Sequence, residues 1–302
     1  GSLAIQRDLA EQAVRTHIAE KSGLSLLDAA YGAHLIANSN MVRAIKSVSV
    51  ERGRDPTDFV LMVFGGAGPI HAVGVARELG IKRVIIPPAP GVFSAFGLLR
   101  ADVEQHTART VLTSTHNADL EAINSILEEM RAELVRVLTQ EGYEQTAVIT
   151  TPFADLRYQG QSSEITLPLA GLPLTEEELR AAEQRFEIEF ERTYGHRSAH
   201  KQFELVTVRL IASVSRLASD LGDWTEEPGA AGEPVLRDVY FGARHGIVRT
   251  AVIPRAALTA QARQGPVIIQ EYDTSVIVPP GCNAALDMHR NIIVEVRDES
   301  AA

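Results

Sequence analysis

A glycine-rich turn between an apolar strand and a helix is the feature that most constrains this chain. We expect the strand over residues 59–64, the turn over 65–69 and the helix over 70–79, with a second apolar run at 81–86. A strand, a helix and a further strand in this order form a right-handed crossover with a parallel strand pair. The sequence therefore predicts an α/β fold.

The turn consists of small residues, namely Gly65, Gly66, Ala67 and Gly68, and Pro69 closes it. Backbone without bulky side chains lets a bound group come close, and the amides at a helix start favour an anion. The spacing matches neither the dinucleotide motif nor the Walker motif, and Pro69 lacks one of the amides that a phosphate cradle would use. Two interpretations stay open: a nucleotide or phosphate contact, and a tight turn that only packs closely.

Composition excludes several classes of protein. The chain has 302 residues, 45% of them apolar and 23% charged, with a net charge of -10. This length predicts about two domains, and an acidic chain without a block of lysine and arginine is not expected to bind nucleic acid. No apolar run approaches the ~20 residues that span a bilayer, and the start does not resemble a signal peptide. We therefore expect no membrane partner and a cytoplasmic location.

Cysteine and histidine give little sign of a metal site. Cys282 is the single cysteine, so it cannot form an internal disulfide, and we expect it to be a buried small apolar residue. His196 and His200 are four residues apart but lack the glutamate of the zinc motif H-E-x-x-H. His34 and His106 have no ligand spacing either, so we expect no bound transition metal.

The chain divides into three expected parts. Residues 1–105 carry the glycine turn, and residues 106–218 form a second α/β unit. Residues 219–302 begin with a linker rich in glycine and proline at 219–234 and continue as short apolar runs. These runs favour a small antiparallel sheet or a barrel-like unit.

Periodicity predicts the elements within these parts. Helix 25–45 starts at Ser25 or Asp28, and helix 175–193 starts at Thr175 with capping-box spacing. The other expected helices are 7–21 and 118–141, with 91–99 a helix or loop, and the expected strands are 107–112, 148–158, 205–214, 239–241, 247–253, 265–270, 274–278 and 291–296.

A series of motifs runs in order along the whole chain. They are the segments 38–45, 48–56, 64–72, 87–99, 155–161, 194–196, 265–269 and 278–281. Together these segments closely resemble the hydantoinase A and 5-oxoprolinase family. The resemblance implies a two-lobed ATPase fold of the actin-like (sugar kinase/chaperone) type, to which residues 1–105 would contribute part of the second lobe.

The resemblance also implies an activity and its cofactors. Members of this family couple ATP hydrolysis to the opening of cyclic amides or imides such as hydantoin, N-methylhydantoin and 5-oxoproline. In that fold a Gly-Gly turn of the second lobe holds the adenosine end of ATP, which assigns this role to Gly65, Gly66, Ala67 and Gly68. His71 follows the turn closely enough to face the nucleotide, although an ordinary helix histidine is the alternative. ATP and Mg²⁺ are the expected cofactors of the complete protein.

The phosphate loops of the family's N-terminal region are not found in this sequence. We therefore expect a portion of a longer protein that is catalytically incomplete alone. Gly1 and Ser2 are either native or left from cloning.

Asp155, Arg157 and Gln161 are the candidates for the substrate side. They gather an acid, a cation and an amide at the end of a strand, and ring opening needs stabilisation of a developing oxyanion. The alternative is that Asp155 and Arg157 form structural ion pairs with their neighbours, and that Tyr158 is a half-buried aromatic residue.

Three functions are compatible with these motifs. The leading one is the C-terminal portion of an ATP-dependent cyclic-amide hydrolase, and the second is an ATP-binding subunit of a ketone carboxylase. The third is a lobe without catalysis of its own that docks a hydantoinase B-like subunit. That subunit and a cyclic-amide substrate are the expected partners, and a homo-oligomer stays open.

Overall fold

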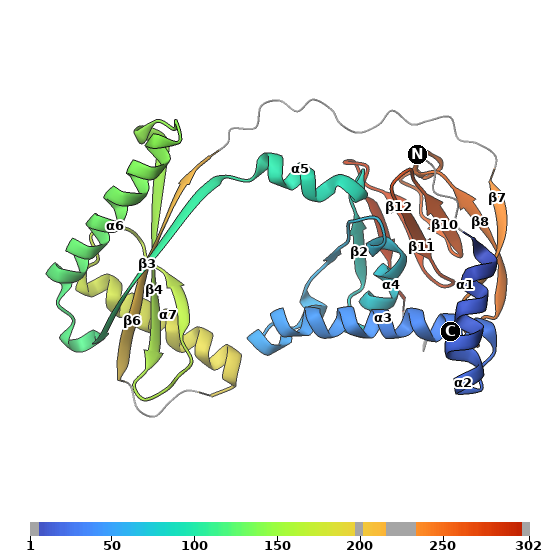
Figure 1. Ribbon diagram of the computed structural model, residues 1–302, viewed down its shortest axis with the longest axis horizontal. Helices are drawn as coiled ribbons and strands as arrows, with labels where there is room; N and C mark the ends of the chain where they lie inside the picture. Colours follow the sequence, from blue (N-terminus) through green and yellow to red (C-terminus); the bar gives the residue numbers. More distant parts are fainter. Residues whose placement is uncertain (1–5, 197–201, 216–233, 298–302) are drawn as a thin grey trace. The chain divides into compact units, whose positions relative to one another are not determined.

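The chain forms two compact units. A computed structural model describes residues 6–196, 202–215 and 234–297. Unit 1 comprises Gly1–Glu51, Asp55–Gly97 and Leu221–Ala302, and unit 2 comprises Arg52–Arg54 and Leu98–Asp220 (Figure 1). Most of the predicted linker, His200 and the first two residues lie outside the described residues.

Helices of unit 1 follow the predicted apolar periodicity. The helix predicted at 7–21 is continuous in the chain but contains a π-helical turn. Ser25 caps α3, because its hydroxyl accepts from the amide of Asp28 at 3.1 Å. The elements are α1 (Arg7–Val14), the π turn (Arg15–Ala19), α2 (Glu20–Ser22), α3 (Leu26–Val48), α4 (Gly68–Leu79) and α5 (Phe93–Arg100), which crosses the boundary between the units.

Two sheets complete unit 1. The first has the order β1-β2-β13-β12-β9, and the second has the order β11-β10-β8-β7. The predicted parallel pair is confirmed, since β1 and β2 pair in parallel, although β1 is shorter than expected. The strands are β1 (Leu61–Met62), β2 (Arg83–Ile86), β7 (Val235–Tyr240), β8 (Ile247–Ile253), β9 (Arg263–Gln264), β10 (Val267–Gln270), β11 (Ser275–Val278), β12 (Asn283–Leu286) and β13 (Ile292–Glu295).

The C-terminal strands differ from the expected separate unit. Strand β13 pairs antiparallel with β2, so the tail extends the sheet that carries the glycine turn. Strands β8 and β10 pair in parallel, so the tail is not a purely antiparallel sheet. The physical reason is burial: Ile86 of β2 and Ile292 of β13 belong to one core with Val276 of β11 and Ala76 of α4. Neither segment could cover its apolar side chains alone.

Unit 2 is a four-stranded antiparallel sheet with two helices on one side (Figure 1). Its strand order is β3-β6-β4-β5. Thr175 caps α7 as predicted, because its hydroxyl accepts from the amide of Glu178 at 3.2 Å. The elements are β3 (Val103–Ser114), α6 (Leu120–Gln140), β4 (Val148–Tyr158), β5 (Ile165–Pro168), α7 (Glu176–Tyr194) and β6 (Phe203–Val214).

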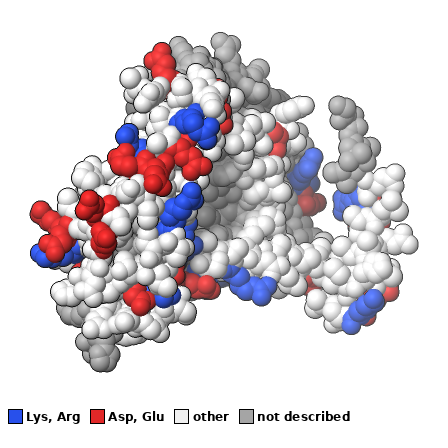
Figure 2. All heavy atoms as spheres, turned by 60° about the vertical axis from the view of Figure 1, so that its left-hand side comes forward, with Lys and Arg blue, Asp and Glu red and all other residues white. Residues whose placement is uncertain are grey.

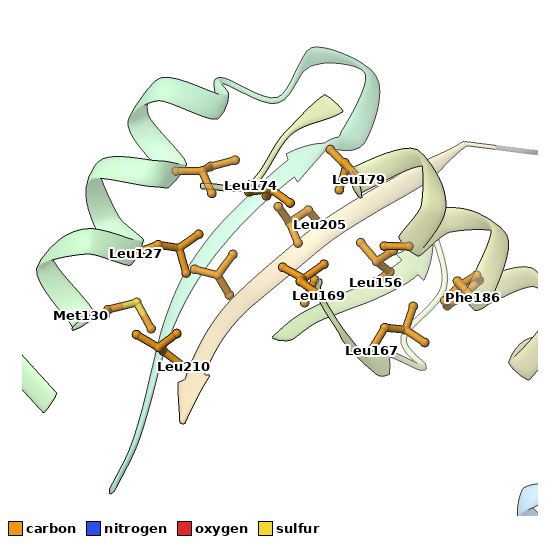
Figure 3. Close-up of a cluster of buried hydrophobic side chains, with 14 of the residues drawn as sticks. Leu127, Met130, Leu156, Leu167, Leu169, Leu174, Leu179, Phe186, Leu205 and Leu210 are labelled. Atoms are coloured by element: carbon orange, nitrogen blue, oxygen red, sulfur yellow. The ribbon is translucent and has the colours of Figure 1, made fainter. Parts of the chain in front are cut away.

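A leucine-rich core joins the helices of unit 2 to its sheet. Leu127 and Met130 of α6 and Phe186 of α7 face Leu156 of β4 and Leu210 of β6 (Figure 3). All five side chains are almost completely buried, and burial of each stabilises the fold by ~1.5–3 kcal/mol. This core makes unit 2 a rigid support for the polar face of β4.

The surface of unit 2 is rich in paired charges. The view that brings the left-hand side of Figure 1 forward shows groups of acidic side chains with basic ones beside them (Figure 2). Arg131 and Glu128 of α6 form one such ion pair, at 2.9 Å. No helix of the described residues has the length and apolarity needed to cross a membrane.

Candidate functional site

The glycine turn presents free backbone donors at the start of α4. Gly65 has φ +89°, and its amide donates to the carbonyl of Pro90 at 2.7 Å. Among the described residues no acceptor takes the amides of Gly66, Ala67 or Gly68. Three consecutive unpaired amides at the start of a 12-residue helix suit an anion or a polar ligand edge.

Two other loops of unit 1 meet at this turn. The hydroxyl of Thr274 donates to the carbonyl of Gly66 at 2.9 Å, and the amide of Gly91 donates to Asp273 Oδ2 at 2.7 Å. A Cβ atom at position 66 would lie 3.3 Å from the carbonyl oxygen of Asp273, and one at position 91 would lie 2.7 Å from its Cβ. Gly66 and Gly91 thus allow Asp273 to pack closely. Gly65 has open space around it, and glycine is favoured there because its φ is positive.

Arg255 fixes these loops from inside the unit. The residue is 8% exposed, and its guanidinium donates to Glu271 at 2.7 and 2.8 Å and to the carbonyl of Pro87 at 2.8 Å. One contact holds the turn that carries Asp273, and the other holds the segment that leads to Gly91. Arg255 therefore sets the distance between the two loops that flank the glycine turn.

An apolar surface lies beside the turn. Phe64 directly precedes the turn, is 44% exposed, and lies 5.3 Å from the ring of Phe93 between centroids. Met62 of β1 is 50% exposed. Free amides next to half-exposed aromatic rings are compatible with a nucleotide, which has both a polar and a flat apolar part.

His71 packs against α3. Its Nδ1 atom donates to Asn38 Oδ1 at 2.7 Å, and its ring stacks on that of His34 with 4.6 Å between centroids. Asn38 is 1% exposed and donates from Nδ2 to His34 Nε2 at 3.3 Å. A side chain at position 74 would overlap the Asn38 amide, so Gly74 lets α3 and α4 approach. These contacts show a helix-packing role for His71, and its contact with a nucleotide stays a prediction.

Asp155 lies in unit 2, and its buried carboxylate forms an ion pair with the half-exposed Arg209. Asp155 is 1% exposed and accepts from Arg209 Nε at 2.7 and 3.0 Å and from the hydroxyl of Thr166 at 2.7 Å. Arg209 and Thr166 are on the strands β6 and β5 that flank β4. Its carboxylate is therefore occupied in joining three strands.

The side chain of Arg157 also forms ion pairs, whereas the side chain of Gln161 forms none. Arg157 Nε donates to Glu204 at 2.8 Å, and its guanidinium lies 3.7 Å from Glu164. The backbone amide of Gln161 donates to the carbonyl of Tyr158. Its side chain is half-buried and has no hydrogen-bond partner in the described part of the chain. The structure thus shows the ion pairs that the sequence left as the alternative, and a catalytic role of Asp155, Arg157 or Gln161 stays a prediction.

Tyr158 differs from the expectation of a half-buried ring. It is 2% exposed and stacks on Phe203 at 5.2 Å between centroids, with Phe186 at 5.0 Å edge-on. The strand alternation of β4 places it on the core face, opposite to Asp155 and Arg157.

Comparison with known proteins identifies the family. The family described as Hydantoinase/oxoprolinase matches residues 1–107, and the Hydantoinase/oxoprolinase C-terminal domain matches residues 112–297. The chain belongs to the hydantoinase/oxoprolinase family. The resemblance found in the sequence is thereby confirmed.

Members of this family with known names include lactam hydrolases and ketone carboxylases. Caprolactamase subunit alpha of Pseudomonas jessenii is 32% identical over 95% of this chain and 42% of that protein. The crystal structure of ATP-dependent caprolactamase from the same organism matches 98% of this chain and 44% of that chain, with a TM-score of 0.81 and 29% identity. The nucleotide-free structure of acetone carboxylase matches the same shares with a TM-score of 0.67 and 25% identity.

These matches settle the fold class. The expected α/β fold, with its part of an actin-like ATPase lobe, is confirmed by the caprolactamase structure. The chain spans less than half the length of the relatives it matches. Substrate, activity and partners of the whole protein are therefore matters for proposal.

Sequence reasoning found the glycine turn but missed the residues that surround it. Asp273, Thr274, Arg255 and Glu271 come about two hundred positions later, and no local pattern links them to the turn. Among the described residues, no three His, Cys, Asp or Glu side chains gather as a metal site would require.

Proposed function

We propose that this chain is part of an ATP-dependent hydrolase that opens cyclic amides, with the glycine turn of unit 1 in contact with ATP. The observation that carries the proposal is the run of free amides at Gly66, Ala67 and Gly68 in a chain that belongs to the hydantoinase/oxoprolinase family. The similarity to an ATP-dependent caprolactamase supports both the cofactor and the reaction class. A ketone carboxylase subunit is the weaker alternative.

The residues present fit part of a nucleotide. The free amides can donate to its polar atoms, and Phe64 and Phe93 offer apolar surface to the base. The carboxylate of Asp273 lies beside the turn and would repel phosphate groups, which favours the adenosine end there. ATP would bring Mg²⁺ with it and would supply the energy that drives amide opening.

The residues of β4 take a different part in this proposal. Asp155 and Arg157 hold β4 to its neighbours, so they act as positioning residues. Gln161 follows the strand at a turn where Gly160 has φ +82°, and its side chain is the group of the three that is available to a substrate. We expect Gln161→Ala to lower turnover while leaving the free energy of unfolding unchanged within ~0.5 kcal/mol.

The protein partner in this proposal is a hydantoinase B-like subunit. The proposed location is the cytoplasm, where ATP is available. Caprolactamase and the ketone carboxylases are named by their subunits, which supports a multi-subunit assembly. On its own the 302-residue chain should bind nucleotide without turning over.

A chimera tests the proposal. This chain replaces the matching region of caprolactamase subunit alpha, the cognate second subunit is added, and ADP release is measured with and without ε-caprolactam. The proposal expects release that a cyclic amide stimulates, and loss of that stimulation with Gly66→Ala in the chimera. ADP release stimulated only by a ketone with bicarbonate would overturn it in favour of the carboxylase.

A further inference from the structure

A cavity of about 450 Å³ lies within unit 1, and no residue of the glycine turn lines it. Helices α3 and α4 and strands β7 and β11 contribute to its wall. This volume is at the lower end for small-molecule sites, which are mostly apolar with a few polar groups. The apolar part of the wall includes Leu27, Leu35, Ile70, Val73, Val239 and Ile277.

Tyr31, His34 and Tyr240 form an aromatic strip along the wall, and their hydroxyls and ring nitrogens are its polar atoms. The rings of Tyr31 and His34 stack with 6.0 Å between centroids, and Tyr240 meets Tyr31 edge-on at 5.8 Å. Tyr31, His34 and Asn38 follow one another on one face of α3 because they are three and four residues apart. Such a strip suits a flat ring, which can lie against the aromatic faces.

Burial favours the neutral form of His34, and its contact with Asn38 fixes the tautomer. Asn38 Nδ2 can only donate, so His34 Nε2 accepts and its proton is on Nδ1. Burial, and then the neighbouring His71 ring, lowers the pKa of His34. His34 therefore offers a donor, and the hydroxyl oxygen of Tyr240, whose proton goes to Asp28, keeps a lone pair as an acceptor.

The charges near the cavity are engaged by protein groups. Asp28 accepts from Tyr240 and from Ser25, and these hydrogen bonds lower the pKa of the Asp28 carboxyl. Arg77 donates to the carbonyl of Pro280 at 3.3 Å and to the sulfur of Cys282 at 3.4 Å. Glu78 lines the cavity together with Arg77, and Asp28 is hydrogen-bonded to the lining residue Tyr240, so two carboxylates and one guanidinium belong to this part of unit 1. A ligand carboxylate would meet net negative charge, so a neutral ligand is favoured.

We propose that this cavity binds a neutral cyclic amide, a lactam or imide without a carboxylate. The ring amide has a carbonyl and an N–H side by side, which match the His34 donor and the Tyr240 acceptor. The choice of an amide rests on the proposed function, whereas the preference for a neutral ring rests on the charges of the wall. The cavity thus selects a caprolactam-type ligand over 5-oxoproline, which carries a carboxylate.

Calorimetric titration of the 302-residue chain with ε-caprolactam tests this inference, with Leu35→Trp as the blocking variant. Leu35 lines the cavity and is 41% exposed, so a larger side chain can enter it without disturbing the core. Ile36→Trp is the matched control, because Ile36 is the next residue on α3, is 66% exposed and does not line the cavity. Leu27→Trp is a second blocking variant at another part of the wall.

We expect ε-caprolactam to bind the unaltered chain and Ile36→Trp equally, and to bind each blocking variant at least tenfold more weakly. We also expect 5-oxoproline to bind at least tenfold more weakly than ε-caprolactam. Absence of binding, equal binding by the blocking variants, or a preference for 5-oxoproline would overturn the inference. Because the measurement involves neither ATP nor turnover, failure here is distinct from failure of the chimera to release ADP.

Discussion

The two units use their polar groups in opposite ways. In unit 2, the charged residues predicted for catalysis are paired: Asp155 with Arg209, and Arg157 with Glu204. In unit 1, the glycine turn leaves the amides of Gly66, Ala67 and Gly68 without protein acceptors in the described residues. A ligand therefore meets less competition from protein groups at the glycine turn than at the face of β4.

The difference shows that residue type alone does not tell which polar groups are free to meet a ligand. Asp155 has the chemistry of a catalytic acid, but its carboxylate already accepts three hydrogen bonds from two neighbouring strands, so its catalytic role stays a prediction. Glycines have no side-chain chemistry, but they leave the main chain uncovered and its donors available to a ligand.

The largest expected effect is on the pair in unit 2. Arg209→Met keeps the alkyl stem but leaves the buried carboxylate of Asp155 without its cation. Because Arg209 itself is about half exposed, we expect the free energy of unfolding to fall by ~2–3 kcal/mol, less than for a fully buried pair. Urea denaturation measures the change. Arg109→Met is the control, because the pair of Arg109 with Glu133 is exposed at 3.6 Å and should contribute less than ~1 kcal/mol. If both variants are equally stable, the pair of Asp155 with Arg209 contributes no more than an exposed pair, and a chemical role of Asp155 is favoured.

The next effect concerns ligand binding in unit 1. Gly66→Ala adds a methyl group at the run of free amides, and we expect nucleotide affinity to fall at least tenfold, or about 1.4 kcal/mol. Competition with a fluorescent ATP analogue measures it. Gly32→Ala on α3, where a Cβ atom meets nothing within 4 Å, should leave affinity unchanged. If both variants bind equally well, the turn only packs.

A smaller effect separates backbone conformation from contact. Gly65 has φ +89° and open space around its missing Cβ atom. Gly65→Ala should therefore cost about 1 kcal/mol of unfolding free energy through backbone strain alone. Thermal denaturation monitored by circular dichroism provides the measurement, and a stability equal to that of the unaltered chain would show that the turn adapts.

The smallest effect is a pH dependence of unit 1. The pKa of His34 is lowered from 6.5 in the folded state, so the unfolded chain binds the proton more tightly. The unfolding free energy should therefore fall as pH drops below about 6.5, and the decline should be shallower in His34→Phe. Chemical denaturation at pH 7.5 and pH 5.5 measures both slopes. Identical slopes would show that His34 titrates normally.

Sequence reasoning predicted local features well and distant contacts poorly. The caps at Ser25 and Thr175, the strand β4 and the parallel β1–β2 pair follow from nearby residues. The pairing of β13 with β2 depends on burial of side chains some two hundred positions apart, so no local period reveals it. The expected three-part division therefore differs from the two units of the structure.

The candidate sites show the same difference between local features and distant contacts. The glycine turn is visible in the sequence, but Asp273 and Arg255 reach it only through the sheet topology. The alternative of ion pairs for Asp155 and Arg157 was readable from their spacing, whereas their partners Arg209 and Glu204 could be named only from the register of β4 and β6.

A titration of the ¹⁵N-labelled chain with MgATP, observed through its backbone amide resonances, tests whether the glycine turn contacts ATP. We expect the largest shifts at the amides of Gly66, Ala67 and Gly68, and unchanged resonances for the amides of Asp155 and Arg157. Unchanged resonances at the three amides of the turn, together with saturable shifts elsewhere, would contradict this contact.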